Sequence, residues 1–315
     1  MQNPAISVII PAYNAAATIR ETIQSVLQQT FQDFEVIIIN DGSTDDTLKI
    51  VQQITDSRLQ VLSFENSGPQ HSRNRGLEVA RGEYIALLDA DDLWAPQKLE
   101  QQFTALQKSP MTAIAFSWTD TIDENSQVTQ ACKRPQNSGY IFTALILDNF
   151  LGSGSNPLIP AKAIRSVGGF DEAILAGQDW DMWLSLAANY EFLLVPEVHI
   201  FYRKTSITRS WSSHLQRQEK GLMQVMNKHL NQPAAADVSK ARCLANCYRY
   251  LLFECFEKCS PSFAHGLLAL RFFCRAVILE PGWWVQRYRM VLVVLAKSMK
   301  YLVTIRNQPN TAPTS

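Results

Sequence analysis

The sequence lacks several features that would identify a function class directly. Its 315 residues carry 29 Lys and Arg against 29 Asp and Glu, so the chain has no charge excess. Nucleic-acid-binding proteins usually show a basic excess, because their Lys and Arg neutralise phosphates, and we therefore expect no nucleic-acid partner. The patterns G-x-x-x-x-G-K-[ST] and G-x-G-x-x-G are also absent. Their absence disfavours an ordinary P-loop or Rossmann cofactor site.

Targeting and membrane-spanning patterns are lacking as well. The N-terminus, MQNPAISVIIPAYNA, has no basic start, and its apolar run breaks at Pro11, unlike a secretory signal. Residues 290–296 form an apolar run that ends before Lys297, whereas a spanning helix needs about 20 apolar residues. We expect a cytoplasmic protein.

The last predicted helices allow two interpretations. Trp283, Trp284, Arg287, Arg289 and Lys297 accompany apolar positions there. Such a segment is either an interfacial amphipathic helix or a packed helix with a solvated basic face. The first interpretation implies peripheral contact with the inner face of a membrane, and the second is the simpler one.

Cysteine is scarce outside the last quarter of the chain, which holds five of the six. This clustering does not resemble a disulfide framework, so we expect reduced thiols. Cys243/Cys247 and Cys255/Cys259 are each four residues apart in a predicted helix. A zinc site is disfavoured, because structural zinc sites usually place their cysteines around turns.

The first part of the chain alternates short apolar runs with helical periodicity. Strands are predicted at residues 6–10, 34–39, 59–64 and 84–88, and helices at 15–29, 44–54 and 69–80. Strands alternating with helices of this length form βαβ units with right-handed crossovers. The sequence therefore predicts an α/β fold with a doubly wound, mostly parallel sheet.

The pattern changes twice further along. Beyond about residue 110 it loosens into mixed strands and loops, and from Ser212 it becomes helical. We expect one domain over 1–211, with halves 1–110 and 111–211. A C-terminal region with three or four helices should follow over 212–306, and then a disordered tail over 307–315.

Polar residues follow the predicted strands. Ligands on such sheets bind where the strands end, and the strand at 84–88 ends in Asp89-Ala90-Asp91-Asp92. Of two carboxylates one residue apart, one can hold a divalent cation that also binds a diphosphate, while the other faces the sugar or ribose hydroxyls. A solvated acidic turn is the alternative for this motif taken alone.

Four segments occur in order at strand ends or helix starts: Pro11-Ala-Tyr-Asn14, Asn40-Asp-Gly-Ser-Thr-Asp45, His71-Ser-Arg-Asn-Arg-Gly76 and Asp89-Ala-Asp91. With these segments the chain resembles an inverting family 2 glycosyltransferase of the GT-A fold, over about residues 5–210. The resemblance implies a Rossmann-like nucleotide-sugar domain, and the helical pattern from Ser212 makes the C-terminal region a helical extension to it.

The resemblance also implies a donor site. In such a site Pro11 and Tyr13 line the base, Asp41 accepts hydrogen bonds from the base or ribose, and Arg73 lies near the nucleotide. Asp89 contacts the ribose or sugar, and Asp91 coordinates Mn²⁺ or Mg²⁺ on the diphosphate. Alternatively, Asp41 and Asp45 only form an Asx-turn that caps the next helix.

An acceptor-side segment follows at Gly177-Gln-Asp-Trp-Asp181. The family usually has Glu-Asp where this chain has Gln178-Asp179, and the resemblance implies that Asp179 is the general base. Asp181 is the second candidate, and Gln178 contacts the acceptor or diphosphate. Trp180 either stacks on a sugar or belongs to the core, as Trp at helical spacing more often does.

The family's Tyr-Arg-x-His segment is altered, because Thr205 stands where the His is expected. Arg203, Lys204 or Arg209 can supply cationic contacts to the diphosphate instead. The histidines at 199, 229 and 265 are interpreted as structural.

The implied function is inverting transfer of a sugar from a UDP- or TDP-linked donor to a hydroxyl of a saccharide or lipid-linked acceptor. Surface polysaccharide or glycan synthesis is the expected setting. The alternative is a non-catalytic nucleotide-sugar-binding or assembly module of the same fold, motivated by the altered residues at 178 and 205.

Overall fold

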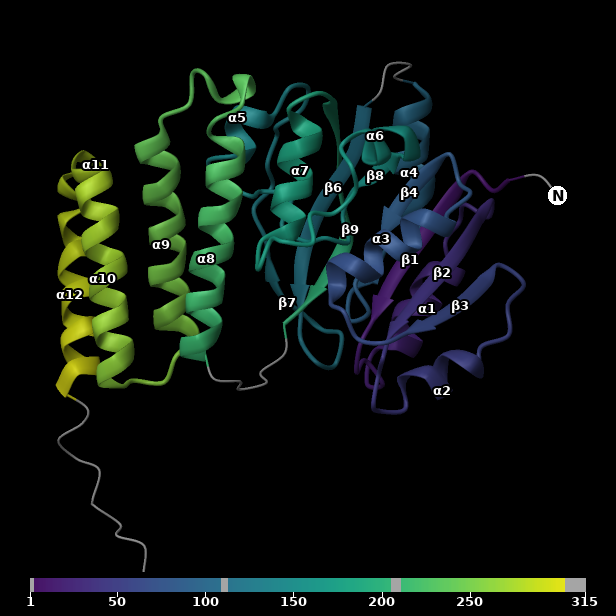
Figure 1. Ribbon diagram of the computed structural model, residues 1–315, viewed down its shortest axis with the longest axis horizontal. Coiled ribbons are helices and arrows are strands. Elements are labelled where there is room, and N and C mark those ends of the chain that lie inside the picture. The colour runs from purple at the N-terminus through teal and green to yellow at the C-terminus, as the bar shows by residue number, and fades with distance from the viewer. Residues whose placement is uncertain (1–2, 109–112, 205–210, 304–315) are drawn as a thin grey trace, which may run out of the picture. The chain divides into compact units, whose positions relative to one another are not determined.

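The computed structural model describes residues 3–108, 113–204 and 211–303 (Figure 1). The chain divides into two compact units. The first comprises Met1–Ala173 and Gln178–Ser206, and the second comprises Ile174–Gly177 and Ile207–Ser315. Thr205, Arg209 and the expected tail at 307–315 lie outside the described residues.

The first unit is built on one sheet with the strand order β3-β2-β1-β4-β8-β6-β9-β5, and β7 pairs with β6. Its strands are β1 (Ile6–Ala12), β2 (Phe34–Asp41), β3 (Leu59–Phe64), β4 (Tyr84–Leu87), β5 (Leu93–Trp94), β6 (Ala113–Ile122), β7 (Val128–Ala131), β8 (Leu158–Pro160) and β9 (Glu191–Arg203). The long ladders, β1 with β2, β2 with β3 and β6 with β9, are parallel. The antiparallel ladders have three residue pairs or fewer. The expectation of a mostly parallel sheet is confirmed.

The central strands explain why this sheet forms. The runs at β1 and β2 are apolar without alternation, and Val8, Ile10, Val36 and Ile38 are completely buried. A parallel strand that is covered on both faces requires such a run.

The helices of the first unit connect these strands. They are α1 (Ile19–Leu27), α2 (Thr47–Gln52), α3 (Pro69–Val79), α4 (Lys98–Gln107), α5 (Phe142–Leu145), α6 (Ala161–Ser166) and α7 (Gln178–Ala187). The predicted starts of the first two, at 15 and 44, are wrong. Both segments are held in loops that bond to each other, because Ala15 donates its N–H to the Thr47 hydroxyl and Thr44 donates its N–H to the Asn14 side chain.

The second unit is helical. It contains α8 (Trp211–His229), a 3₁₀ turn η1 (Pro233–Ala235), α9 (Lys240–Lys258), α10 (Phe263–Leu279), α11 (Pro281–Val285) and α12 (Tyr288–Val303). The described part of this unit thus has five α-helices where three or four were expected. Pro281 starts the extra one, since proline fits the first helical position but cannot continue a preceding helix.

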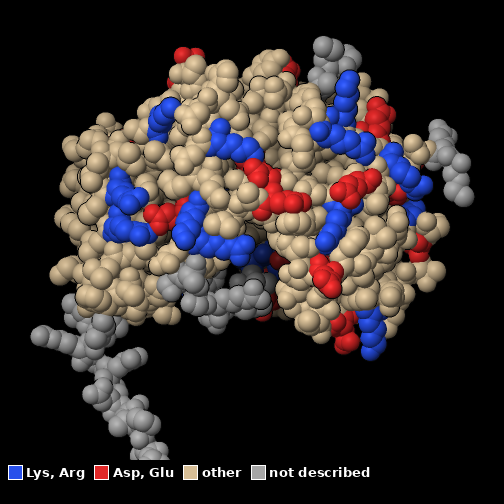
Figure 2. Space-filling view, in the orientation of Figure 1, with Lys and Arg blue, Asp and Glu red and all other residues tan. Residues whose placement is uncertain are grey.

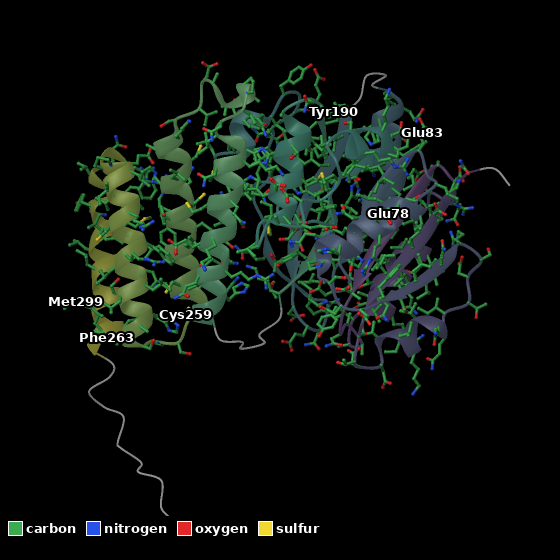
Figure 3. All side chains as sticks on the ribbon, in the orientation of Figure 1. Glu78, Glu83, Tyr190, Cys259, Phe263 and Met299 are labelled. Carbon is green, nitrogen blue, oxygen red and sulfur yellow. The ribbon has the colours of Figure 1, made fainter. Side chains whose placement is uncertain are left out.

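Buried thiols fill part of this helical core. Cys243, Cys247 and Cys255 on α9 are free and buried, and burial raises the pKa of the Cys247 thiol to about 12. Cys259, labelled in Figure 3, ends the same helix and is also buried. These thiols behave as small apolar side chains.

The charged side chains at the surface agree with the equal numbers of acidic and basic residues in the sequence. Acidic and basic side chains are interspersed on the face shown in Figure 2. Within the described ranges, every helix is too short or too polar to traverse a lipid bilayer.

Candidate active site

Three carboxylates gather just after β4. Asp89, Asp91 and Asp92 follow the end of this strand at Leu87. Asp89 and Asp91 are partly exposed, whereas Asp92 is fully buried. The two members of the D-x-D pattern are therefore the ones that a ligand can reach.

Arg73 on α3 joins this cluster to the acceptor-side segment. Its guanidinium Nη2 lies 2.5 Å from an Asp89 oxygen, and its Nη1 lies 3.3 Å from an Asp179 oxygen. Burial opposes the charge on Arg73, but the carboxylates of Asp179 and Asp89 outweigh it and raise the pKa of Arg73. One buried cation thus brings together the residues predicted for the donor and for the base.

Asp179 lies in the first turn of α7, and its side chain is 26% exposed. Burial raises the pKa of its carboxyl, Arg73 acts against this rise, and Asp89 adds to it. Gly154 makes room for the carboxylate, because a Cβ at this glycine would lie only 2.9 to 3.0 Å from the Asp179 carboxylate atoms. A raised pKa suits a carboxylate that must take up a proton near neutral pH.

Asp91 has the electrostatics of an uncompensated carboxylate. Burial and the nearby Asp89 raise its pKa to about 6, despite an opposing effect of Arg203. A divalent cation bound there would relieve this penalty, and hard cations such as Mg²⁺ and Mn²⁺ prefer carboxylate oxygens. The Asp91 carboxylate therefore fits a divalent cation, whereas one oxygen of Asp89 is bound to Arg73.

Asp92 supports the loop and was not among the predicted site residues. One of its oxygens accepts hydrogen bonds from the hydroxyls of Ser153 and Ser155, and the other accepts the N–H of Arg203. Ser155 also accepts the Asp89 N–H through its hydroxyl. Asp92 fixes the backbone that carries Asp89 and Asp91, and its position next to an acidic motif gave no signal of this role.

The prediction that Arg203 contacts the diphosphate is wrong, because its side chain is buried in the protein. Its guanidinium is 1% exposed and donates to the backbone carbonyls of Asp91, Asp123 and Glu124, to Ser126 and to the Glu21 carboxylate. With its donors engaged on these groups, it is not available to bind a diphosphate. Lys204 is exposed at the end of this described range.

The neighbouring strand ends carry the predicted base-binding residues. Pro11 pairs with Ile39 in the β1–β2 ladder, and Tyr13, just beyond β1, is 49% exposed. Asp41 is buried, and its two oxygens accept the N–H groups of Ser67 and Gly68. Each oxygen retains a lone pair for a further donor.

Asp45 has the structural role that was considered as an alternative. Its carboxylate accepts the N–H groups of Thr47 and Ala16. Burial would raise its pKa, but these hydrogen bonds and that of the Thr47 hydroxyl lower it. Asp45 therefore forms the Asx-turn before α2, and Asp41 does not.

The residues next to Asp179 differ in burial, and this decides between the interpretations given for them. Trp180 is buried, and its indole N–H donates to the Leu145 carbonyl at 2.8 Å, so the sugar-stacking interpretation is wrong and the core interpretation is right. Asp181 is only 2% exposed, which makes it a poorer candidate base than Asp179. Gln178 is partly exposed at the start of α7.

Asn74, next to Arg73, has a role that the sequence analysis missed. Its side chain accepts the Phe170 N–H and donates to the Phe170 carbonyl and the Glu172 carboxylate. A Cβ at Gly169 would lie 2.8 Å from the Asn74 oxygen. The segment that leads to Asp179 is thus tied to α3, and Gly169 in the sequence was the available signal.

A buried polar cluster lies on α4 and β9. Lys98 is completely buried and lies 3.9 Å from the centroid of the Trp94 ring, whose N–H donates to Ser155. His199 is buried and hydrogen-bonds Ser117 through Nδ1. Burial lowers the pKa of His199 to about 4, and Lys98 adds to this effect despite Glu197. The structural role predicted for His199 agrees with this environment.

Comparison with known proteins identifies the family. A sequence model of the family described as glycosyltransferase like family 2 matches residues 7–255. The chain belongs to this family. The glycosyltransferase is 30% identical over 209 residues to an uncharacterized glycosyltransferase of Methanocaldococcus jannaschii, covering 64% of this chain and 72% of the relative. It is also 34% identical over 188 residues to the chondroitin synthase of Escherichia coli, covering 58% of this chain and 26% of that protein. The match spans 65% of the length of two Rickettsia relatives and 23–31% of five longer relatives.

Solved structures support the fold of this glycosyltransferase. TarS 1–349 of S. aureus, in complex with UDP-GlcNAc, matches with a TM-score of 0.63 at 18% identity, covering 95% of this chain and 90% of that one. A mannosyltransferase of Pyrobaculum calidifontis, in complex with GDP-Man and Mn²⁺, matches with a TM-score of 0.56 at 20% identity, covering 99% and 89%. The expected GT-A fold with added C-terminal helices is confirmed.

Proposed function

We propose that this glycosyltransferase transfers a sugar, with inversion, from a UDP- or TDP-linked donor to a hydroxyl of a saccharide or lipid-linked acceptor. The observation that carries the proposal is the contact of one guanidinium, that of Arg73, with both Asp89 and Asp179. Asp89 on the donor side and Asp179, the candidate base, therefore contact the same side chain. An in-line displacement at the anomeric carbon requires the donor and the base to be held in one site.

In this proposal Asp91 holds a divalent cation on the donor diphosphate, and Asp89 contacts the ribose or sugar. The cation, when bound, stabilises the negative charge of the leaving diphosphate. Asp92, Ser153 and Ser155 keep the loop in place, so its carboxylates do not have to be ordered when the donor binds. The Mn²⁺ in the Pyrobaculum mannosyltransferase supports a divalent cation for this fold.

Asp179 is proposed to remove the proton from the acceptor hydroxyl during attack. Burial and Asp89 raise the pKa of Asp179 and Arg73 opposes this rise, so the carboxylate is a stronger base than an exposed aspartate. Arg73 remains beside it as a fixed positive charge. Attack from the face opposite the leaving diphosphate inverts the configuration at the anomeric carbon.

Pro11 and Tyr13 are proposed to line the base, with the free lone pairs of Asp41 for the base or ribose. Gln178 and Lys204 are the candidate contacts for the acceptor or diphosphate. The chondroitin synthase relative supports a saccharide acceptor in polysaccharide or glycan synthesis, and a lipid-linked acceptor would bring the enzyme to a membrane.

Isothermal titration tests the donor site. We expect UDP or TDP to bind in a Mn²⁺-dependent manner, and we expect an Asp91→Ala variant to lose this dependence. The matched control is Asp148→Asn, which alters a carboxylate of the same unit with 60% side-chain exposure. Absence of binding for both nucleotides under all conditions would contradict the proposal.

Turnover tests the alternative of a non-catalytic binding module. An Asp179→Asn variant should bind nucleotide like the wild type and lose release of UDP or TDP from the matching nucleotide-sugar. NMR of the product should give an anomeric configuration opposite to that of the donor. Donor binding without any turnover by the wild type across nucleotide-sugars and acceptors would favour the binding module.

A further inference from the structure

The helix α12 exposes an apolar stripe that no described residue covers. Tyr288, Leu292, Leu295 and Met299 follow one another at spacings of four, three and four residues, so they lie on one face of the helix. They are 60%, 62%, 40% and 58% exposed. Met299 lies at the edge of the helical unit in Figure 3. A contiguous exposed apolar stripe of this kind marks an interaction surface.

Two arginines flank the start of this stripe. Arg287 and Arg289 are the chain neighbours of Tyr288, whereas Lys297 lies on the opposite face of α12. These three make aromatic contacts, with Trp283, Tyr288 and Phe256 respectively. Among the residues that the structure describes, none of the three forms an ion pair. The sequence from 281 to 303 contains no Asp or Glu.

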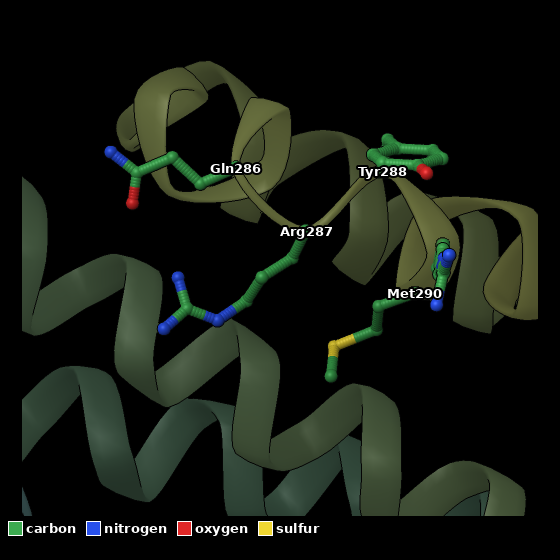
Figure 4. Close-up of a pocket in the computed structure, with 5 residues that line it drawn as sticks. Gln286, Arg287, Tyr288 and Met290 are labelled. Carbon is green, nitrogen blue, oxygen red and sulfur yellow. The ribbon is translucent and has the colours of Figure 1, made fainter.

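A hollow lies where the stripe begins. It has a volume of about 460 Å³ and is lined by Gln286, Arg287, Tyr288, Arg289 and Met290 (Figure 4). Its lining combines two guanidinium groups, an amide and apolar atoms, without any carboxylate. Guanidinium groups bind phosphate oxygens in a bidentate manner, so the hollow is suited to a phosphate-bearing headgroup.

The charge of this face decides between two occupants. A second copy of the chain, paired by two-fold symmetry, would place the basic 281–303 segment against itself without acidic side chains from this segment to meet it. An anionic lipid surface supplies the missing negative charge and also accepts the apolar stripe. The stripe is too short to span the bilayer, so it would lie in the interface.

We infer that α11 and α12 form a docking surface for an anionic phospholipid membrane. The apolar stripe enters the headgroup boundary, and Arg287 and Arg289 hold a lipid phosphate in the hollow. This inference deepens the proposed function and rests on it in one respect, because a lipid-linked acceptor would be presented at such a membrane.

Vesicle sedimentation of the full chain tests the surface. The probes are vesicles of phosphatidylcholine with 30% phosphatidylglycerol and vesicles of phosphatidylcholine alone, at low and high salt and without donor. We expect binding to the anionic vesicles at low salt. The double variant Arg287→Glu/Arg289→Glu should lower the partition coefficient about tenfold or more, because each basic residue near an anionic surface contributes measurably. Leu292→Asp should lower it similarly.

Matched controls separate this surface from general effects. Val128→Asp changes a side chain of the first unit with 57% exposure, and Lys108→Glu reverses an exposed charge there. Both should bind vesicles like the wild type, and so should Asp179→Asn, which tests turnover alone. A failure of the proposed chemistry is therefore distinguishable from a failure of the docking surface.

Three results would overturn the inference. The first is no sedimentation with anionic vesicles at low salt, and the second is unchanged binding in both surface variants. The third is a dimer in light scattering that Leu292→Asp dissociates, together with absence of vesicle binding, since this would assign the face to a second copy.

Discussion

The guanidinium of Arg73 lies 3.3 Å from the carboxylate of Asp179, in a site where both side chains are largely withdrawn from water. The two residues are 106 positions apart in the sequence, on α3 and α7. Because opposite charges stabilise each other strongly where water is scarce, Arg73 favours the ionised form of Asp179. The base proposed for the reaction is thus controlled from the donor side of the site.

Replacing Arg73 by Gln should shift the acid limb of the pH–rate profile. Burial and Asp89 raise the pKa of Asp179 and the positive charge of Arg73 lowers it, so loss of the cation should raise this pKa further. The acid limb of kcat should move to higher pH, whereas Arg73→Lys should restore much of the original profile. An unchanged acid limb in Arg73→Gln would show that Asp179 is not the titrating base.

Gly154→Ala should impair turnover more than donor binding. The added Cβ would lie within 3.0 Å of the Asp179 carboxylate and must displace it. A shift of the base of about 1 Å can cost about a hundredfold in kcat. Kinetic assays measure kcat, and titration measures the affinity for the nucleotide. Gly282→Ala is the control, because a Cβ there meets no atom within 4 Å. Equal turnover of the two variants would argue against Asp179.

Adjacent carboxylates should respond in opposite ways to amide replacement. Asp92→Asn places an amide NH₂ group where an oxygen now accepts hydrogen bonds, and should cost about 1–3 kcal/mol of the free energy of unfolding. Asp91→Asn removes a charge that burial and Asp89 disfavour, and should leave metal-free stability equal or higher at pH 8. Thermal unfolding measures the first effect and Mn²⁺ titration the loss of metal affinity in the second. A stable Asp92→Asn protein with weakened Mn²⁺ binding would reverse the two assignments.

His199 should make the protein less stable in mild acid. Burial lowers its pKa from 6.5 to about 4, so the unfolded chain binds its proton first as the pH falls. This stability is fully present above pH 6.5 and is lost as the pH falls toward 4, by about 3 kcal/mol in total. His199→Asn retains a polar atom for Ser117 and should reduce the fall in Tm between pH 7.5 and 5.

The raised pKa of Asp91 works in the opposite direction over part of this range, because protonation near pH 6 favours the folded state. The Asp91→Asn variant is therefore compared with the Asp91→Asn/His199→Asn double variant, so that residue 199 is the only difference between them. A fall in Tm of the same size in both would assign the acid sensitivity to other groups.

The local sequence pattern predicted the parallel half of the sheet, because β1 and β2 contain apolar runs without alternation. A strand that is buried on both faces requires such a run. It did not predict β5 or β8, which have two and three residues. Their extended conformation depends on partners far away in the chain, β9 and β4. The start of α1 was misplaced for the same reason, since Ala15 is held by Thr47.

The candidate site shows the same difference between features with a local sequence pattern and features that depend on distant contacts. Asp89, Asp91 and Asp179 were predicted by resemblance, and the structure brings Asp89 and Asp179 to Arg73. Arg203 was misassigned and Trp180 was left between two interpretations because their residue types suit a ligand, whereas their burial depends on tertiary contacts with Glu21 and Leu145. The support that Asp92 gives to the loop has no local pattern, because its partners lie about 60 and 111 residues away.

The hydrogen bond from the Arg203 backbone to Asp92 has a consequence for synthesis on the ribosome. The D-x-D loop is translated early, but the amide that completes its support comes 111 residues later. At about 5–20 residues per second, the loop emerges roughly 5–20 s before this partner does. β4 lacks its partner β8 during the first part of this interval, and the loop lacks the Arg203 amide throughout it. A nascent chain arrested before residue 203 should therefore carry the whole acidic motif and yet bind no metal ion with the affinity of the finished enzyme.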